Sequence, residues 1–186
     1  MKISGGQYKG RNFYMPAGIR PTQGVLRAAI FDILGHDLSG LSLLELFAGS
    51  GAVSMEFISR GAAEVTMVEH NDLNAKTIRE NCEILSIDLG GNYRLIHADA
   101  FATVKRLSEE KKHFDVVFFD PPFGLSLAKK TLKLITSRDI LHAQSLVIAQ
   151  FDSTDGIETP EGFKVLTERR YGSSYLSIYQ KVGNNG

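Results

Sequence analysis

Short apolar runs alternate with helical segments between residues 41 and 151, and this alternation limits the possible fold more than any other feature of the chain. The clearest run is Phe114–Phe119 (FDVVFF), whose nearly continuous apolar character is typical of a strand covered on both faces. Strands that alternate with helices predict a parallel sheet with helices packed on both sides. The strands expected in this region are Leu41–Phe47, Glu64–Glu69, Tyr93–His97, Phe114–Phe119 and Ser145–Phe151, and the helices are Ala52–Ser59, Asp72–Ser86, a segment from Asp99 to about Ser108, and 125–136.

The N-terminal part departs from this alternation. Residues 1–18 predict two short strands, around Lys2–Ser4 and Asn12–Met15, on either side of a turn that contains glycine. Thr22 can then cap a helix that continues to Gly35.

The C-terminal part ends in a predicted hairpin formed by Phe163–Arg170 and Ser174–Lys181. We therefore expect a Rossmann-like α/β fold whose seven-stranded sheet is mostly parallel and closes with this antiparallel hairpin. The expected organisation is a hairpin arm at residues 1–20 followed by one main domain at residues 21–183. In folds of this class, ligands bind beyond the carboxyl ends of the parallel strands.

Charge is distributed unevenly along a chain whose net charge is zero. The first 31 residues contain five Lys or Arg residues and no Asp or Glu, whereas the rest of the chain carries 16 basic and 21 acidic residues. A basic arm on a mildly acidic body indicates an anionic partner that is bound at one end of the protein.

Composition excludes several other classes of protein. The single cysteine, Cys82, rules out an internal disulfide framework, and no His/Cys cluster has the spacing of a zinc site, so we expect no metal. No apolar run approaches the roughly 18 residues that a membrane helix needs, and Met1–Gly6 lacks the apolar core of a signal peptide. We expect a cytoplasmic monomer without a membrane partner.

Acidic residues lie at or just after the ends of four expected strands: Glu45, Glu69, Asp99 and Asp120. A single acid at such a place is usually a helix cap or a solvated turn residue. Four of them at the edge where ligands bind predict a polar site there.

The segment Phe47–Gly51 (FAGSG) follows the first of these strands and opens a helix. Its two glycines permit positive φ and a close approach of the backbone to a ligand. The third glycine of the dinucleotide fingerprint is replaced by Ser54, which disfavours a pyrophosphate site. Glu69 at the end of the next strand can accept hydrogen bonds from vicinal ribose hydroxyls, and Asp99 can accept one from an adenine amine. The sequence thus predicts a nucleoside pocket, with His70 lining its adenine side.

The segment Asp120–Phe123 (DPPF) directly follows the apolar strand Phe114–Phe119. Its two prolines stiffen the loop and supply no N–H. The Asp120 carboxylate and the Pro121 carbonyl can accept both N–H groups of an amine on an aromatic base, and Phe123 can stack on that base. Holding the amine in this way frees its lone pair to act as a nucleophile.

The order FAGSG, Glu69, Asp99, DPPF resembles the class I S-adenosylmethionine-dependent methyltransferases, in the subgroup that methylates amino groups. More narrowly, the chain resembles the bacterial RsmD family, which methylates N2 of one guanine in small-subunit (16S) ribosomal RNA. The residues that carry this resemblance span nearly the whole chain: Gly10-Arg11, Arg20-Pro21-Thr22, Arg27, LELFAGSGA, Ser59–Ala62, Val68-Glu69, Asn81, Asp99, FDVVFFDPPF and Tyr171-Gly172. The family usually has Thr-Asp-Arg-Val-Arg after Arg-Pro, where this chain has Thr22–Arg27 (TQGVLR), and it often has Tyr at position 123.

The resemblance implies S-adenosylmethionine as the cofactor and 16S rRNA, within the small subunit or its assembly intermediate, as the partner. It implies three groups of site residues. The cofactor group is Glu45, Phe47, Ala48, Gly49, Ser50, Gly51, Glu69, His70, Asp99, Ala100 and Asp120; the catalytic group is Asp120, Pro121, Pro122 and Phe123; the RNA-binding group is Lys9, Arg11, Arg20, Thr22 and Arg27.

The expected reaction is direct attack of the guanine N2 on the methyl group, with Asp120 or water accepting the proton. Cys82, in the middle of a helix, is badly placed for a covalent intermediate. Two alternatives stay open at this point. One keeps the chemistry but acts on adenine N6 or cytosine N4 of DNA, or on a protein glutamine. The other is a non-catalytic module that binds rRNA during ribosome assembly.

Overall fold

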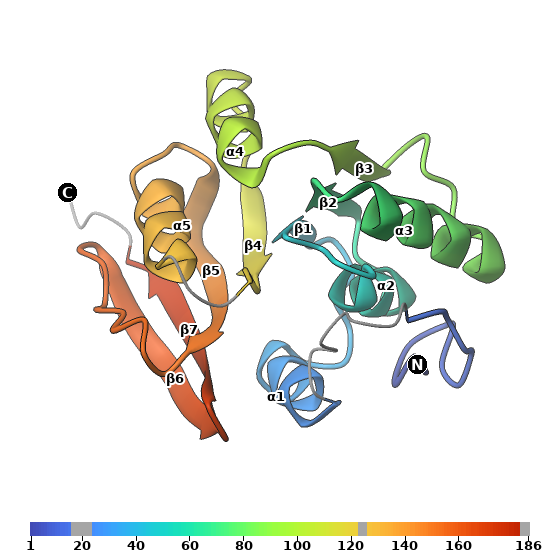
Figure 1. Cartoon of the computed structure of the whole chain (residues 1–186), viewed down its shortest axis with the longest axis horizontal. Helices are drawn as coiled ribbons and strands as arrows, with labels where there is room; N and C mark the ends of the chain where they lie inside the picture. The colour runs from blue at the N-terminus through green and yellow to red at the C-terminus, as the bar shows by residue number, and fades with distance from the viewer. Residues whose placement is uncertain (16–23, 123–125, 183–186) are drawn as a thin grey trace. The chain divides into compact units, whose positions relative to one another are not determined.

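The computed structural model describes residues 1–15, 24–122 and 126–182, and the chain forms two compact units, Met1–Asp99 and Ala100–Gly186 (Figure 1). Arg20, Thr22 and Phe123 lie outside the described residues, so what the sequence predicts for them stays a prediction.

The first unit contains three parallel strands in the order β3-β2-β1. Leu44 pairs with Thr66 across the first two strands, and Val68 pairs with Ile96 across the next two. Because all three strands run the same way, their carboxyl ends meet at one edge. The elements of this unit are α1 (Gly24–Leu34), β1 (Ser42–Leu46), α2 (Ala52–Ser59), β2 (Glu64–Glu69), α3 (Asp72–Leu85) and β3 (Tyr93–His97).

Two helices of this unit differ in how they are buried. Every residue of α2 is buried, whereas α3 buries one face, formed by Ala75, Thr77, Ile78, Asn81, Cys82 and Leu85. The Asn71 side chain caps α3 by accepting hydrogen bonds from the backbone N–H groups of Leu73 at 3.0 Å and Asn74 at 3.1 Å.

The N-terminal arm folds back on itself, but less regularly than the sequence predicts. Only one bridge, Lys2 with Asn12, takes the place of the two expected short strands in the described part of the arm. The two segments still run antiparallel, since the Ile3 N–H donates to the Arg11 carbonyl at 3.0 Å and the Phe13 N–H donates to the Met1 carbonyl at 2.9 Å. Gly6 (φ 72°) and Gly10 (φ 84°) lie in the turn between them, where positive φ suits glycine. Ile3 and Phe13 are nevertheless buried. Figure 1 shows the arm in dark blue beside α2 and the end of α3.

The second unit contains four strands in the order β4-β5-β7-β6. The β4 and β5 strands are parallel, and the last two strands form the predicted antiparallel hairpin. Five of the six β4 residues are buried, as expected for its apolar sequence. The elements are α4 (Ala100–Glu109), β4 (Phe114–Phe119), α5 (Leu127–Thr136), β5 (Leu141–Asp152), β6 (Phe163–Tyr171) and β7 (Ser174–Lys181).

The β5 strand begins earlier than the expected range, 145–151. Its first part pairs Phe114 with Leu141, and the register then shifts so that Val116 pairs with Leu146. Gln144 has a φ of 65° within this irregular stretch, and the Ser145 hydroxyl donates to the Phe114 carbonyl at 2.7 Å. A bulge of this kind hides strand residues from a search for regular alternation.

The predicted α/β class is confirmed: the described residues form seven strands, and β7 runs antiparallel to both β5 and β6. The predicted bounds of α2, β2, β3 and β4 coincide with the observed ones. No helix within the described residues is long and apolar enough to cross a membrane.

Candidate active site

The loop that joins β1 to α2 has an unusual backbone. Gly49 (φ 58°) and Gly51 (φ 75°) have positive φ, as their residue type allows, but Phe47 also has a φ of 57°. A bulky residue rarely adopts this conformation, and holding it costs on the order of 1–3 kcal/mol. Strain of this kind gathers at ligand sites. A Cβ atom at Gly51 would lie 3.2 Å from the Met55 Cε atom, so the packing behind the loop also favours glycine.

The Glu69 carboxylate joins the ends of two strands. Its Oε2 atom accepts the Gly49 N–H at 2.7 Å, and its Oε1 atom accepts the Asn71 N–H at 2.8 Å. Only 4% of Glu69 is exposed. Each carboxylate oxygen can accept two hydrogen bonds, so this group retains capacity to accept from ribose hydroxyls. The predicted neighbourhood of the glycine loop and Glu69 is therefore present.

The end of β3 lies beside the end of β2. The Ala98 N–H donates to the Glu69 carbonyl at 3.0 Å, which brings Asp99 to the same edge. Asp99 is exposed and Ala100, which begins α4, is buried. The side chain of His70 is 65% exposed, with its Nδ1 atom 3.4 Å from Glu69 Oε1.

Glu45, which the sequence predicts among the cofactor residues, is hydrogen-bonded to the start of helix α2. It is only 2% exposed, and its carboxylate accepts hydrogen bonds from the Ser54 N–H at 2.9 Å and from the Ser54 hydroxyl. Ser54 lies in the first turn of α2, where unpaired N–H groups favour a negative charge. The structure thus gives Glu45 a supporting role, because it fixes the helix that the glycine loop opens.

Asn81 on α3 links three parts of the first unit. Its side-chain amide donates to the carbonyls of Ser50 at 3.1 Å and Tyr14 at 3.0 Å, and its oxygen accepts the Tyr14 N–H at 2.7 Å. The residue is fully buried. Sequence reasoning noted Asn81 only within the family resemblance. The sequence did contain a signal for this role: the helical period places Asn81, a polar residue, on the apolar face of α3.

A buried ion pair anchors the arm, and sequence reasoning missed it. Glu56 is fully buried, and its carboxylate accepts from the N–H groups of Ser4 (2.9 Å) and Gly5 (2.8 Å) and from the Ser4 hydroxyl (2.7 Å). The Arg60 guanidinium lies 2.9 Å from the same carboxylate. The sequence did contain a signal for this pair: Glu56 is the one charged residue within the segment AVSMEFIS.

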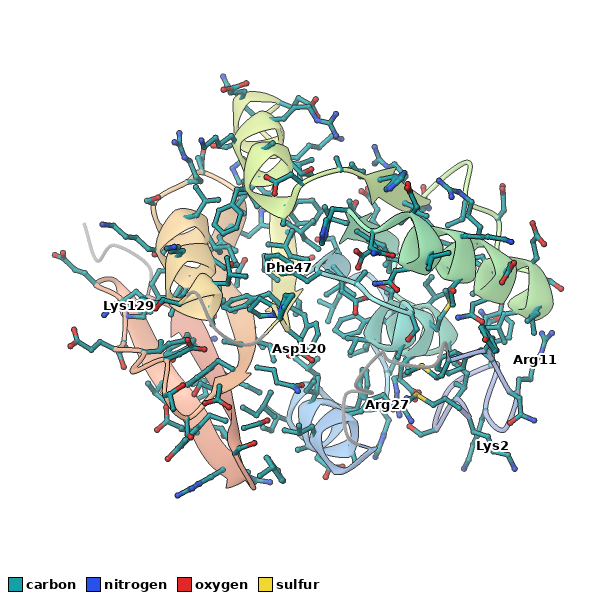
Figure 2. The ribbon with its side chains drawn as sticks, in the orientation of Figure 1. Lys2, Arg11, Arg27, Phe47, Asp120 and Lys129 are labelled. Carbon is teal, nitrogen blue, oxygen red and sulfur yellow. The ribbon has the colours of Figure 1, made fainter. Side chains whose placement is uncertain are left out.

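The predicted RNA-binding residues fall into different settings. Lys9 is exposed on the arm. Arg11 is exposed but reaches the end of α3 (Figure 2), where its guanidinium donates to the carbonyls of Leu85, at 3.1 Å, and Ile84.

Arg27, which the sequence predicts among the RNA-binding residues, is only 7% exposed. Its guanidinium donates to the Lys2 carbonyl at 3.2 Å and contacts the Met1 sulfur, and burial lowers its pKa. Arg27 therefore supports the arm from within and does not present its charge to a phosphate.

A cavity of about 430 Å³ lies where the arm meets α1 and α2. Its lining includes Gly5, Lys9, Asp32, His36 and Arg60, and none of the predicted cofactor residues. It is therefore separate from the glycine loop.

The Asp120–Pro122 part of the DPPF segment lies in the second unit, directly after β4 (Figure 2). Asp120 is half-buried, Pro121 is buried and Pro122 is exposed. This placement at the carboxyl end of β4 agrees with the sequence prediction. In the first unit, burial raises the pKa of the Cys82 thiol to about 12, which agrees with the expectation that Cys82 is not a nucleophile.

Comparison with known proteins decides the family. The model of the family described as "Conserved hypothetical protein 95" matches residues 1–180. The chain belongs to this family.

Relatives in this group carry names that agree with the sequence-based resemblance. Ribosomal RNA small subunit methyltransferase D of Escherichia coli is 29% identical over 97% of this chain and 90% of its own length. A Bacillus subtilis protein named "Putative rRNA methyltransferase YlbH" is 30% identical over 98% of this chain and all of its own. The solved structure of "Putative methyltransferase yhhF from Escherichia coli" has a TM-score of 0.86 and 28% identity, and covers 99% of both chains. The predicted family resemblance and the methyltransferase fold are thereby confirmed.

Proposed function

We propose that this protein transfers the methyl group of S-adenosylmethionine to N2 of a guanine in small-subunit (16S) ribosomal RNA. The observation that carries the proposal is the strained Phe47–Gly51 loop, which is hydrogen-bonded to the buried Glu69 carboxylate at a strand edge. The names of the relatives support the substrate class, because Ribosomal RNA small subunit methyltransferase D is named for it.

The cofactor supplies an activated methyl group on sulfur. Residues Phe47–Gly51 would surround its methionine part, where backbone groups can approach closely because of the two glycines. Glu69 would accept the ribose hydroxyls, and Asp99 and Ala100 would flank the adenine, with His70 beside it. Each of these residues follows or ends one of three neighbouring parallel strands, which is where such folds bind ligands.

The DPPF segment of the second unit would hold the guanine. The Asp120 carboxylate and the Pro121 carbonyl would accept hydrogen bonds from the exocyclic amine, which favours the pyramidal geometry of a nucleophile. The amine nitrogen would bond to the methyl carbon as that carbon leaves the cofactor sulfur, and Asp120 or water would accept the proton. Phe123 would stack on the base, which contributes about 1–3 kcal/mol. A stacked guanine cannot reach such a pocket, so the target must be unpaired or flipped out.

The remaining parts of the proposal concern the partner and the place of action. Lys9 and Arg11 carry exposed positive charge on the arm, where they would contact RNA phosphates together with Arg20 and Thr22. The protein would act as a monomer in the cytoplasm on the small subunit or on its assembly intermediate.

The test combines labelled S-adenosylmethionine with small ribosomal subunits from a strain that lacks this protein. The wild-type protein should label one guanine in the 16S rRNA. Asp120→Ala should lower the rate of methyl transfer by about 100-fold or more, because positioning of the amine is lost, and should leave cofactor affinity within about twofold. The control Asp139→Ala removes an exposed aspartate of the same unit, which pairs with His113 at 3.0 Å, and should leave the rate unchanged.

Three outcomes would contradict the proposal. Label in DNA or in protein favours the corresponding alternative substrate, and no label in any of them favours a non-catalytic RNA-binding module. Normal turnover of Asp120→Ala would refute the role of this carboxylate in holding the amine.

A further inference from the structure

Helix α5 presents three lysines on one exposed face and contains no acidic residue. Its buried face is formed by Ala128, Thr131, Leu132 and Ile135. At about 100° of rotation per residue, Lys129, Lys130 and Lys133 fall within an arc of about 100° opposite those residues. All three are exposed. We call them the lysine face.

These lysines form no ion pair with the described residues of the protein. None of the three is within ion-pair distance of a carboxylate in the part of the chain that the structure describes. Two other exposed bases on helices are paired: Lys76 lies 3.7 Å from Glu80 on α3, and Arg106 lies 3.6 Å from Glu110 at the end of α4. Like charges three or four residues apart on a helix repel each other by roughly 0.2–0.5 kcal/mol. The lysine face therefore gives α5 no stability of its own.

The position of α5 connects this face to the substrate. The helix begins seven residues after Asp120 within the same unit, and Lys129 lies in its first turn. Figure 2 shows Asp120 at the tip of β4 and Lys129 on α5, the next element of the chain. A base held by the DPPF segment would leave its flanking phosphates near the start of this helix.

We propose that the lysine face binds the phosphates of the RNA strand next to the target guanine, an inference that rests on the proposed function. Phosphate contacts fix the register of a nucleic acid without reading its sequence. Three flexible ammonium groups on a rigid helix suit this task, because the strand can shift while each lysine follows its phosphate. An exposed helix face that carries lysines and no large apolar side chain is less suited to a folded protein partner.

The test measures rRNA affinity as a function of KCl concentration. The variant Lys129→Gln/Lys130→Gln/Lys133→Gln should reduce the slope of log affinity against log salt by about 2, since each phosphate contact to a single strand contributes about 0.7. Between about 50 mM and about 200 mM KCl, the wild type should therefore lose about 20-fold more affinity than the variant. The KM for rRNA should rise, while kcat at saturating rRNA and cofactor affinity should stay unchanged.

Two control variants separate the effect of the lysine face from an effect of total charge. Lys105→Gln/Lys111→Gln/Lys112→Gln removes three exposed charges from the same unit, one in the middle of α4 and two in the turn that follows it, and should keep the wild-type slope. The triple Lys→Arg variant of the lysine face should also keep it.

Each other outcome overturns the inference in a recognisable way. An unchanged slope in the Gln variant, with normal methylation by the wild type, refutes the lysine face and leaves the proposed function standing. An equal loss of slope in the α4 control shows an effect of total charge only. A wild-type protein that neither binds nor methylates rRNA refutes both the proposed function and this inference, and loss of binding to an acidic polypeptide alone would assign the face to a protein partner.

Discussion

The buried pair of Glu56 and Arg60 offers the sharpest test of how the arm is attached. The Glu56 carboxylate receives three hydrogen bonds from the arm and two from Arg60, whose side chain is only 5% exposed. Glu56→Gln keeps the shape but removes the charge, and the new amide group would face donors. Leaving a buried guanidinium without its partner costs about 3–5 kcal/mol.

Urea unfolding followed by circular dichroism measures this cost. With a slope of about 2 kcal/mol per M, a loss of about 4 kcal/mol lowers the midpoint by about 2 M. The matched control is Glu64→Gln, because Glu64 forms an exposed pair with Arg94 at 3.7 Å. An exposed pair contributes about 0–1 kcal/mol, so this variant should unfold within about 0.5 M of the wild type.

Comparing the unfolding free energies of Glu56→Gln and Glu64→Gln shows whether the Glu56 carboxylate holds the arm. If Glu56→Gln loses less than about 1 kcal/mol, as its exposed control does, the Glu56 carboxylate does not hold the arm and the buried network is not a source of stability. If it loses the expected amount, limited proteolysis should also cut residues 1–15 faster in the variant.

Three further predictions concern the first unit. Asn71→Ala should lower the free energy of unfolding by about 1 kcal/mol through loss of the α3 cap, and an unchanged urea midpoint would show that the cap has no energetic role. Asn81→Ala should cost about 2–4 kcal/mol because it leaves backbone groups of Tyr14 and Ser50 unpaired, and it should weaken cofactor binding measured by calorimetry; normal stability and affinity would argue against the link. Because burial raises the pKa of Cys82 to about 12, iodoacetamide near pH 8 should leave the folded protein unmodified and should alkylate it in urea. The raised pKa also means that stability falls as pH rises above the ordinary thiol value, by about 1.4 kcal/mol at about pH 10, and a flat profile there would contradict the burial of this thiol.

Periodicity was sufficient to predict most of the fold, because the strands of a parallel sheet carry apolar runs that are hard to mistake. Phe114–Phe119 and Glu64–Glu69 were predicted with their observed bounds for this reason. The start of β5 was not, since a bulge near Gln144 breaks the alternation on which the prediction relied. The arm strands were overestimated, because such short segments pair through a single bridge, Lys2 with Asn12, in the described part of the arm.

The site was predictable where topology alone brings residues together. Gly49 and Glu69 follow neighbouring parallel strands, and the structure joins them by a 2.7 Å hydrogen bond. The roles of Glu45, Arg27 and Asn81 were not predictable in the same way, because each depends on which side chain is buried and what it meets. The sequence does not reveal whether a charged side chain faces a ligand or caps a helix within the protein.

The account depends on one chemical event, and the identity of the methylated nucleoside tests it most directly. After reaction with S-adenosylmethionine and small subunits that lack the modification, the rRNA would be digested to nucleosides and separated by mass spectrometry. We predict that the methyl group appears on guanosine, at N2, and that Asp120→Ala yields about 100-fold less of this product in the same time. A methyl group on adenosine or cytidine, or on guanosine at another atom, would contradict the account.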